Sequence, residues 1–181
     1  MKGTLLWVLF VFVVLDYNLV RKKWYNTRNE RLFMIINNLE ELKEFANKFA
    51  PLLRQGDVIN LIGDMGAGKT TLVNEIARFF KISDSSSPTF AIVNIYEGDM
   101  EMYHLDLYRF EDPDELLDID FETYFYPEGA ITFLEWAENG RGYLPDDMID
   151  IKIGKISEDK REIEILDTTE RAREINELLG N

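Results

Sequence analysis

Residues 61–71, LIGDMGAGKTT, decide the fold of this chain. From Gly63 to Thr70 they match the pattern G-x-x-x-x-G-K-[ST] at every fixed position. Glycines let the backbone turn tightly, so successive N–H groups can point at one anion. The apolar residues before the loop favour a buried strand. The residues after it, KTTLVNEIARFFKI (69–82), favour a helix whose positive N-terminal end adds to the anion site. The stretch therefore predicts a phosphate-binding loop, or P-loop, between a strand and a helix.

The side chains after the glycines indicate which phosphate compound is bound. Lys69 can reach the β- and γ-phosphates of a nucleotide, and the Thr70 hydroxyl can hold Mg²⁺. We expect Lys69 to lie near the surface, so that its removal costs little packing. A GTPase would carry an N-K-x-D base reader after the loop. The Asn-Lys pair of this chain, at residues 47–48, precedes the loop and lacks the aspartate. This argues against guanine and leaves ATP with Mg²⁺ as the expected ligand.

A P-loop also needs a carboxylate for the metal, usually at the end of a neighbouring buried strand. Two acids fit that position: Glu135 ends the apolar run AITFLE (130–135), and Asp106 lies in MYHLDLYR (102–109). Either could be an ordinary acid at a strand end, so the residues alone leave the choice open. The single histidine, His104, can be structural or functional on the same grounds.

The segment SSSPTF (85–90) lies between the predicted P-loop helix and the next strand. P-loop proteins often place a loop that senses the γ-phosphate there, and Thr89 offers the hydroxyl for it. The alternative is a plain Ser/Pro loop without a role in nucleotide binding.

The rest of the pattern predicts one mixed α/β domain over residues 34–181. We expect a three-layer, P-loop NTPase-like sandwich, with a largely parallel sheet and helices on both faces. Asn38 and Glu41 have the spacing of a capping box at the start of the first helix. Phe79 and Phe80 should face inward from the P-loop helix. Asp112 should cap a third helix, with Pro113 at its first position. Expected strands cover 32–37, 57–63, 90–98, 99–109 and 129–136, with a hairpin over 147–166. Expected helices cover 37–56, 69–82, 112–125 and 167–181.

Composition narrows the class of protein. The chain has 181 residues, no cysteine and a formal net charge of −14. Without cysteine there is no disulfide or thiolate metal site, and the acidic balance disfavours direct nucleic-acid binding.

Residues 1–33 differ from the rest because residues 5–15 form an unbroken apolar run of 11 residues. A membrane-spanning helix needs about 20. We interpret residues 1–33 as an extension ahead of a start at Met34. The alternatives are a membrane-surface anchor or an extra buried strand.

Four motifs in this order, GDMGAGKTT, SPTF, HLDLYR and EW, resemble the bacterial TsaE (YjeE) family. Members of that family are small P-loop ATPases needed to make threonylcarbamoyladenosine at tRNA position 37. The resemblance covers about residues 34–165, including Leu144-Pro145 after the tryptophan. Residues 1–33 match nothing in the family pattern.

The resemblance implies a role for each matching residue. Thr70 and Glu135 would hold Mg²⁺, Asp106 would be important for hydrolysis, and Thr89 would sit in the switch-like loop. Trp136 would lie beside the nucleotide. Arg161 would approach it from the late hairpin, with Lys160 as the alternative. The nucleotide phosphates would be wrapped by Gly63, Gly66, Ala67, Gly68, Lys69, Thr70 and Thr71.

The resemblance also implies partners. Family members are weak ATPases alone and bind the TsaD–TsaB pair, which transfers the threonylcarbamoyl group. Hydrolysis would then drive a conformational cycle of that complex in the cytoplasm, and tRNA would be contacted only indirectly. The rival functions are a small-molecule P-loop kinase and a nucleotide-gated binding module without significant turnover. Such kinases usually carry an arginine-rich lid, whereas only Arg109 and Arg141 lie between Asp106 and the late hairpin.

Overall fold

The computed structural model describes residues 25–28, 31–82 and 92–180. The predicted switch-loop residue Thr89 and the apolar run of residues 5–15 lie outside the described residues. The strands are β1 (Tyr25–Arg28), β2 (Arg31–Ile36), β3 (Val58–Ile62), β4 (Val93–Tyr96), β5 (Glu101–Asp106), β6 (Ala130–Glu135), β7 (Ile149–Lys155) and β8 (Arg161–Ile165). The α-helices are α2 (Leu39–Phe49), α3 (Lys69–Phe79), α4 (Phe121–Phe125) and α5 (Glu170–Gly180), and the 3₁₀ helices are η1 (Ala50–Leu52), η2 (Pro113–Asp118) and η3 (Ala137–Gly140).

All eight described strands form one sheet in the order β1-β2-β8-β7-β3-β6-β5-β4. The four neighbouring strands β7, β3, β6 and β5 are parallel, and the other pairs are antiparallel. The predicted mixed α/β sheet is therefore confirmed. Its parallel part is limited to these four strands, because hairpins and β2 supply the remaining pairs.

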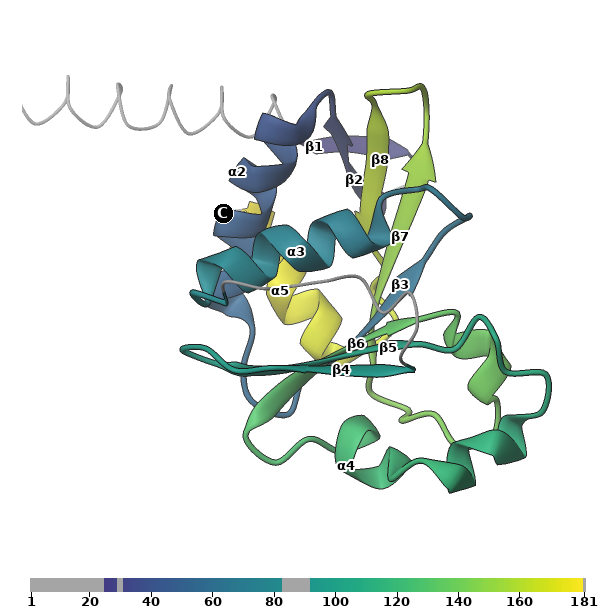
Figure 1. The fold of residues 1–181 in the computed structure, drawn as a ribbon. Coiled ribbons are helices and arrows are strands. Elements are labelled where there is room, and N and C mark those ends of the chain that lie inside the picture. Colours follow the sequence, from purple (N-terminus) through teal and green to yellow (C-terminus); the bar gives the residue numbers. More distant parts are fainter. Residues whose placement is uncertain (1–24, 29–30, 83–91, 181) are drawn as a thin grey trace, which may run out of the picture.

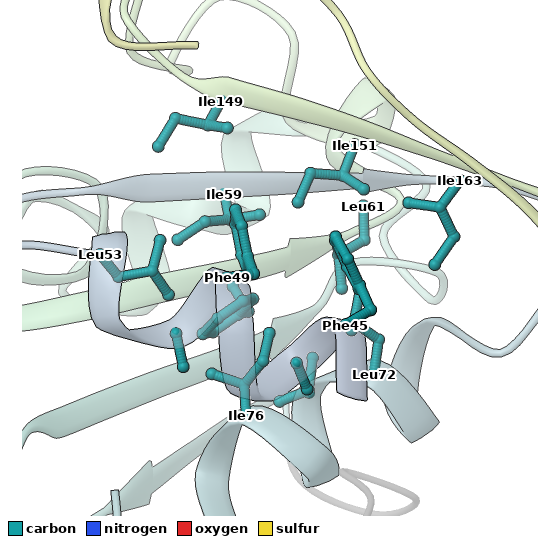
Figure 2. Close-up of a cluster of buried hydrophobic side chains, with 14 of the residues drawn as sticks. Phe45, Phe49, Leu53, Ile59, Leu61, Leu72, Ile76, Ile149, Ile151 and Ile163 are labelled. Atoms are coloured by element: carbon teal, nitrogen blue, oxygen red, sulfur yellow. The ribbon is translucent and has the colours of Figure 1, made fainter. Parts of the chain in front are cut away.

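Helices α2, α3 and α5 pack on one face of the sheet, and η2, α4 and η3 cover β3, β5 and β6 on the other (Figure 1). The larger core lies under the three long helices. Figure 2 shows Phe45 and Phe49 of α2 and Leu72 and Ile76 of α3 facing isoleucines and leucines of β3, β7 and β8. This core holds β3 and α3 in place, and with them the loop that joins the two elements.

Helix α3 ends at Phe79, three residues before the predicted end at residue 82. Phe80 is 7% exposed, but Phe79 is 40% exposed, so the prediction that Phe79 faces inward was wrong. Leu72 and Ile76 define the core-facing stripe, and a further step of four residues reaches Phe80. Phe79 lies about 100° around the helix from Phe80. The two rings pack edge-on, with their centroids 5.2 Å apart.

The predicted helix starts are largely found. Asn38 caps α2 by accepting a hydrogen bond from the N–H of Glu41 at 3.0 Å. The Glu41 carboxylate accepts from the N–H of Asn37, one residue before the cap, so the capping box is displaced by one position. Asp112 and Pro113 begin η2 as predicted, but residues 112–125 divide into η2 and α4 instead of forming one helix.

Strands β1 and β2 begin upstream of the predicted division at residues 33–34. Strand β2 begins at Arg31, and Met34, which is 2% exposed, is registered between Tyr25 of β1 and Ile163 of β8. Residues 25–28 and 31–33 thus belong to the sheet. In the described part of the chain no helix is long and apolar enough to cross a membrane.

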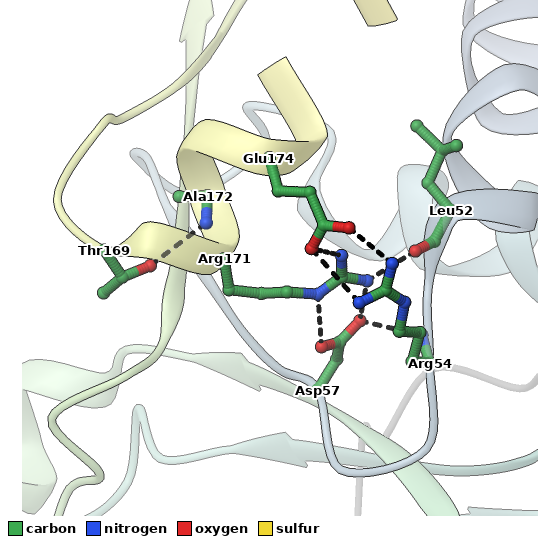
Figure 3. Close-up of polar contacts among 7 residues, drawn as sticks. All are labelled: Leu52, Arg54, Asp57, Thr169, Arg171, Ala172 and Glu174. Atoms are coloured by element: carbon green, nitrogen blue, oxygen red, sulfur yellow. Dashed lines mark hydrogen bonds and ion pairs between the residues drawn. The ribbon is translucent and has the colours of Figure 1, made fainter. Parts of the chain in front are cut away.

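The last helix is fixed by a partly buried ion pair. Arg171 of α5 donates two hydrogen bonds to Asp57, from Nε at 2.9 Å and from Nη2 at 2.8 Å, and a third to Glu174 (Figure 3). The hydrogen bond to Asp57 is the main cause that raises the pKa of Arg171, against the opposing effect of burial. Hydrogen bonds from Arg171 and Arg54 lower the pKa of Glu174. Asp57 directly precedes β3, so the network ties α5 to the strand that leads into the P-loop.

Candidate nucleotide site

The loop after β3 has the backbone that its glycines predict. A Cβ at Gly63 would collide with the carbonyl oxygen of Ile153 on β7, so only glycine fits where β3 ends. Gly66 and Gly68 have φ of +76° and +107°, a region that favours glycine. Gly68 is the N-cap of α3, and Ala67 is buried. The loop therefore ends at a helix N-terminus, the arrangement that binds phosphate.

Lys69 is buried instead of lying near the surface, so that expectation was wrong. Its side chain is 5% exposed. Its Nζ donates to the carbonyl oxygens of Gly63 at 2.8 Å and Asp64 at 3.3 Å, and it lies 3.7 Å from Oε2 of Glu135. The burial results from the side chain folding back over its own loop, which the spacing of the motif does not reveal.

The structure places one of the two candidate carboxylates against the loop. Oε1 of Glu135 accepts a hydrogen bond from the Thr70 hydroxyl at 2.7 Å. Asp106 is registered beside Glu135 on the adjacent strand, but its Oδ1 accepts from the N–H of Tyr108 at 3.0 Å. Glu135 is thus the acid that joins Lys69 and Thr70, and Asp106 lies one strand further out.

Glu135 is held in its ionised form by its neighbours. Burial alone raises the pKa of Glu135, but the hydrogen bond and charge of His104, the hydrogen bond from Thr70 and the charge of Lys69 together outweigh it and lower the pKa. The Nε2 of His104 lies 3.1 Å from Oε1 of Glu135. The sequence left the role of His104 open. Its contact depends on the register of β5 and β6, for which the sequence holds no local signal.

Trp136 follows Glu135 in a left-handed conformation, with φ of +59°. Such a backbone is costly for a bulky residue and often marks a functional site. The indole lies under the Lys69 ammonium, 4.7 Å from the ring centroid, and packs against Tyr108. The predicted neighbourhood of Trp136 and the loop is therefore present.

Arg161, and not its neighbour Lys160, reaches the loop from the late hairpin. Its Nε donates to the carbonyl oxygen of Ala67 at 2.6 Å. Its Nη1 donates to the carbonyl oxygens of Ser157, Glu158 and Lys160. The Lys160 side chain is exposed. Beside these contacts a cleft opens between the start of α2, the loop and the hairpin. It is lined by residues that include Leu39, Gly68, Thr71, Ile153 and Arg161.

A family model described as "Threonylcarbamoyl adenosine biosynthesis protein TsaE" matches residues 36–163. The chain belongs to the TsaE family. The TsaE of Bacillus subtilis is 39% identical over 128 residues, 70% of this chain and 79% of that protein. The TsaE of Haemophilus influenzae is 34% identical over 160 residues, 84% of this chain and 99% of that protein. A solved structure, described as the crystal structure of YdiB from Bacillus subtilis, aligns with a TM-score of 0.68 at 30% identity, over 85% of this chain and 97% of that chain.

The TsaE match contains the whole candidate site and confirms the family predicted from the motifs. TsaE proteins act in the biosynthesis of threonylcarbamoyladenosine in tRNA, so this chain is placed in tRNA modification. The matched range also contains His104 and Arg161, which connect the loop to β5 and to the hairpin. It excludes β1, which is the edge strand beside β2, and α5, which is tied to Asp57 by Arg171.

Proposed function

We propose that this TsaE chain binds ATP with Mg²⁺ and hydrolyses it slowly on its own, to drive the TsaD–TsaB complex in threonylcarbamoylation of tRNA. One observation carries the proposal: Lys69, Thr70 and Glu135 converge at the ends of two adjacent parallel strands, beside a glycine loop and a helix N-terminus. Ligands of α/β sheets bind at this edge, where parallel strands end.

The residues present fit a magnesium ion that is shared with a nucleotide. Thr70 donates its hydroxyl hydrogen to Glu135. The lone pairs of the Thr70 hydroxyl oxygen therefore remain available to a cation. The described residues contain no cluster of three metal-ligating side chains. This suits Mg²⁺, which is usually held by one or two protein oxygens together with substrate phosphates. Bound there, the ion would neutralise charge that develops on the phosphate oxygens during transfer.

The remaining residues bind and orient. Lys69 carries three N–H donors that can leave the loop carbonyls for phosphate oxygens. Backbone N–H groups from Gly66 to Thr71 would hold the phosphates, and Asp106, at the edge of the site, is available to orient the attacking water. Arg109 is the only arginine within the four matched motifs, and the Arg161 guanidinium is held by carbonyl oxygens of the loop and the hairpin, so we expect slow turnover alone. An arginine supplied by a partner can be worth about 10³- to 10⁵-fold in rate.

The first experiment measures ATP binding by calorimetry for the native chain, for Lys69→Ala and for Lys81→Ala. Lys81 is a matched control because its side chain is exposed and pairs only with Asp99 among the described residues. We expect Lys69→Ala to lose ATP binding and Lys81→Ala to keep it. Because Lys69 is buried, urea unfolding of each variant must show that the fold is intact. Unchanged binding in a folded Lys69→Ala would contradict the proposal.

The second experiment measures ATP hydrolysis at fixed Mg²⁺ with the protein alone, with tRNA, and with the TsaD–TsaB pair. Stimulation by the pair and none by tRNA alone is the expected result. Stimulation by tRNA alone would point to a direct RNA role, and phosphate transfer to an added metabolite would identify a kinase.

A further inference from the structure

His104 is a buried polar side chain that the proposed function has not used. It is the only histidine of the chain and is 0% exposed. It lies on β5 between Met102 and Asp106, on the sheet face that α3 covers. A fully buried position on a strand would ordinarily hold a leucine or methionine at lower cost, because an imidazole must satisfy two ring nitrogens. The histidine therefore calls for an explanation in its contacts.

Those contacts assign the hydrogen atoms of the ring. Nε2 lies 3.1 Å from Oε1 of Glu135, and an ionised carboxylate can only accept. Nδ1 is buried and has no hydrogen-bond partner. At Nδ1, a buried N–H without an acceptor would cost more than a bare lone pair. The hydrogen of this contact therefore belongs on Nε2, and the ring donates it to Glu135.

The other polar neighbours of Glu135 both come from the P-loop. Thr70 donates to Oε1, and Lys69 lies near Oε2. Both also have a role in binding the ligand in the proposed function, because Thr70 would bind the cation and Lys69 would move to the phosphates. His104 has no role in binding the ligand, because it lies on β5 and is fully buried. Among these three neighbours it is the one whose hold on the carboxylate persists when a nucleotide binds.

We propose that His104 is a positioning residue, whose Nε2–H fixes Oε1 of Glu135 so that the carboxylate stays directed at the Thr70 hydroxyl when phosphates draw Lys69 away. The inference rests on the proposed nucleotide site. Hydrogen-bonding partners behind a metal-binding carboxylate or histidine typically change metal affinity by about 10- to 100-fold when they are removed.

The first test needs no nucleotide. Because the chain has one histidine, long-range ¹H–¹⁵N spectra of the untagged protein show a single imidazole. We expect a slowly exchanging proton on Nε2, and a shift of that proton in Glu135→Gln. An Nδ1–H tautomer, or a proton signal that Glu135→Gln leaves in place, would overturn the inference.

The second test compares His104→Gln, which keeps an N–H donor at similar reach, with His104→Leu, which keeps volume alone. Met102→Leu is the control for a buried change on the same strand face. ATP affinity is measured by calorimetry with Mg²⁺ and with EDTA. We expect His104→Leu to lose about tenfold with Mg²⁺ and little in EDTA, and His104→Gln and Met102→Leu to stay near the native values.

The outcomes separate this inference from the proposed function. Equal losses in His104→Leu and His104→Gln, or losses of the same size in EDTA, would show that His104 only packs the core. Native behaviour of His104→Leu while Lys69→Ala loses ATP would overturn the positioning role alone. Native ATP binding by Lys69→Ala would overturn the nucleotide site itself.

Discussion

The ammonium group of Lys69 rests on two carbonyl oxygens of its own loop, beside the Glu135 carboxylate and over the indole of Trp136. A cation over an aromatic face in a partly desolvated site contributes on the order of 1–2 kcal/mol. Phosphate oxygens would compete for the same three N–H donors. Binding of a polyphosphate should therefore move Lys69 relative to Trp136.

Tryptophan fluorescence should report that movement. We expect the emission to change when ATP or tripolyphosphate is added, because both compounds offer phosphate oxygens to Lys69. The change should disappear in Trp136→Phe, although the chain retains two other tryptophans. If calorimetry detects ATP binding and the emission stays constant, Lys69 does not leave the indole.

At the scale of elements, the β7–β8 hairpin is tied to the P-loop through one side chain. Arg161 bonds Ala67 of the loop through Nε and three carbonyl oxygens of the hairpin turn through Nη1. The Arg161 guanidinium therefore holds the turn between β7 and β8 against the P-loop before any ligand binds. A lysine has a single donor group and cannot make both sets of bonds at once.

Arg161→Lys should therefore destabilise the protein without nucleotide, by about 1–3 kcal/mol, because it leaves the partly buried carbonyl oxygen of Ala67 without its donor. Urea unfolding of the ligand-free protein measures the change. Lys160→Ala, one residue earlier on the exposed turn, should stay within about 0.5 kcal/mol of the native chain. If Arg161 served only as a nucleotide contact, its replacement would leave the ligand-free stability unchanged.

A second element, α5, is attached by the Asp57, Arg171 and Glu174 network. The pKa of Glu174 is lowered from 4.5 by its hydrogen bonds to Arg171 and Arg54. A lowered pKa in the folded state means that the contribution of Glu174 is complete above the unfolded value and is lost as pH falls through the folded value. Acid should thus weaken the attachment of α5.

The acid dependence of stability should become shallower below about pH 4.5 in Glu174→Gln, since the glutamine cannot titrate. Urea midpoints measured from pH 7 down to pH 3 test this. Glu177→Gln, on the next turn of α5 and exposed, is the control and should keep the native slope. Equal slopes for all three proteins would show that Glu174 does not contribute to the pH dependence.

At the scale of the whole molecule, the features that the sequence predicted are the local ones. The glycine spacing, the apolar run of β3 and the apolar stripe of α3 each lie within about 20 residues, so the P-loop could be predicted. The choice between Glu135 and Asp106 depends on which side chain the pairing of β3, β5 and β6 brings to Thr70. The burial of Lys69 and the contact of His104 depend on the same long-range packing, and no pattern along the chain encodes it.

The distribution of charge over the molecule bears on how a TsaE protein meets tRNA. The formal net charge is −14, yet in residues 1–33 Lys and Arg outnumber Asp and Glu by six to two. The acidic excess therefore lies wholly in the remainder of the chain. A surface of this kind repels the phosphate backbone, and tRNA should be reached only through a partner complex.

We therefore expect no measurable tRNA binding by the isolated chain at physiological salt, by fluorescence anisotropy with labelled tRNA. At low salt, about 0.05 M, any binding should come from the basic N-terminal residues and be lost in the triple variant Arg21→Gln, Lys22→Gln, Lys23→Gln. Binding that survives both physiological salt and the triple variant would require a contact outside those residues. A shallow dependence on salt would point the same way, since each neutralised phosphate adds close to one unit to the slope of log affinity against log salt. Such a result would mean that the chain itself touches the RNA.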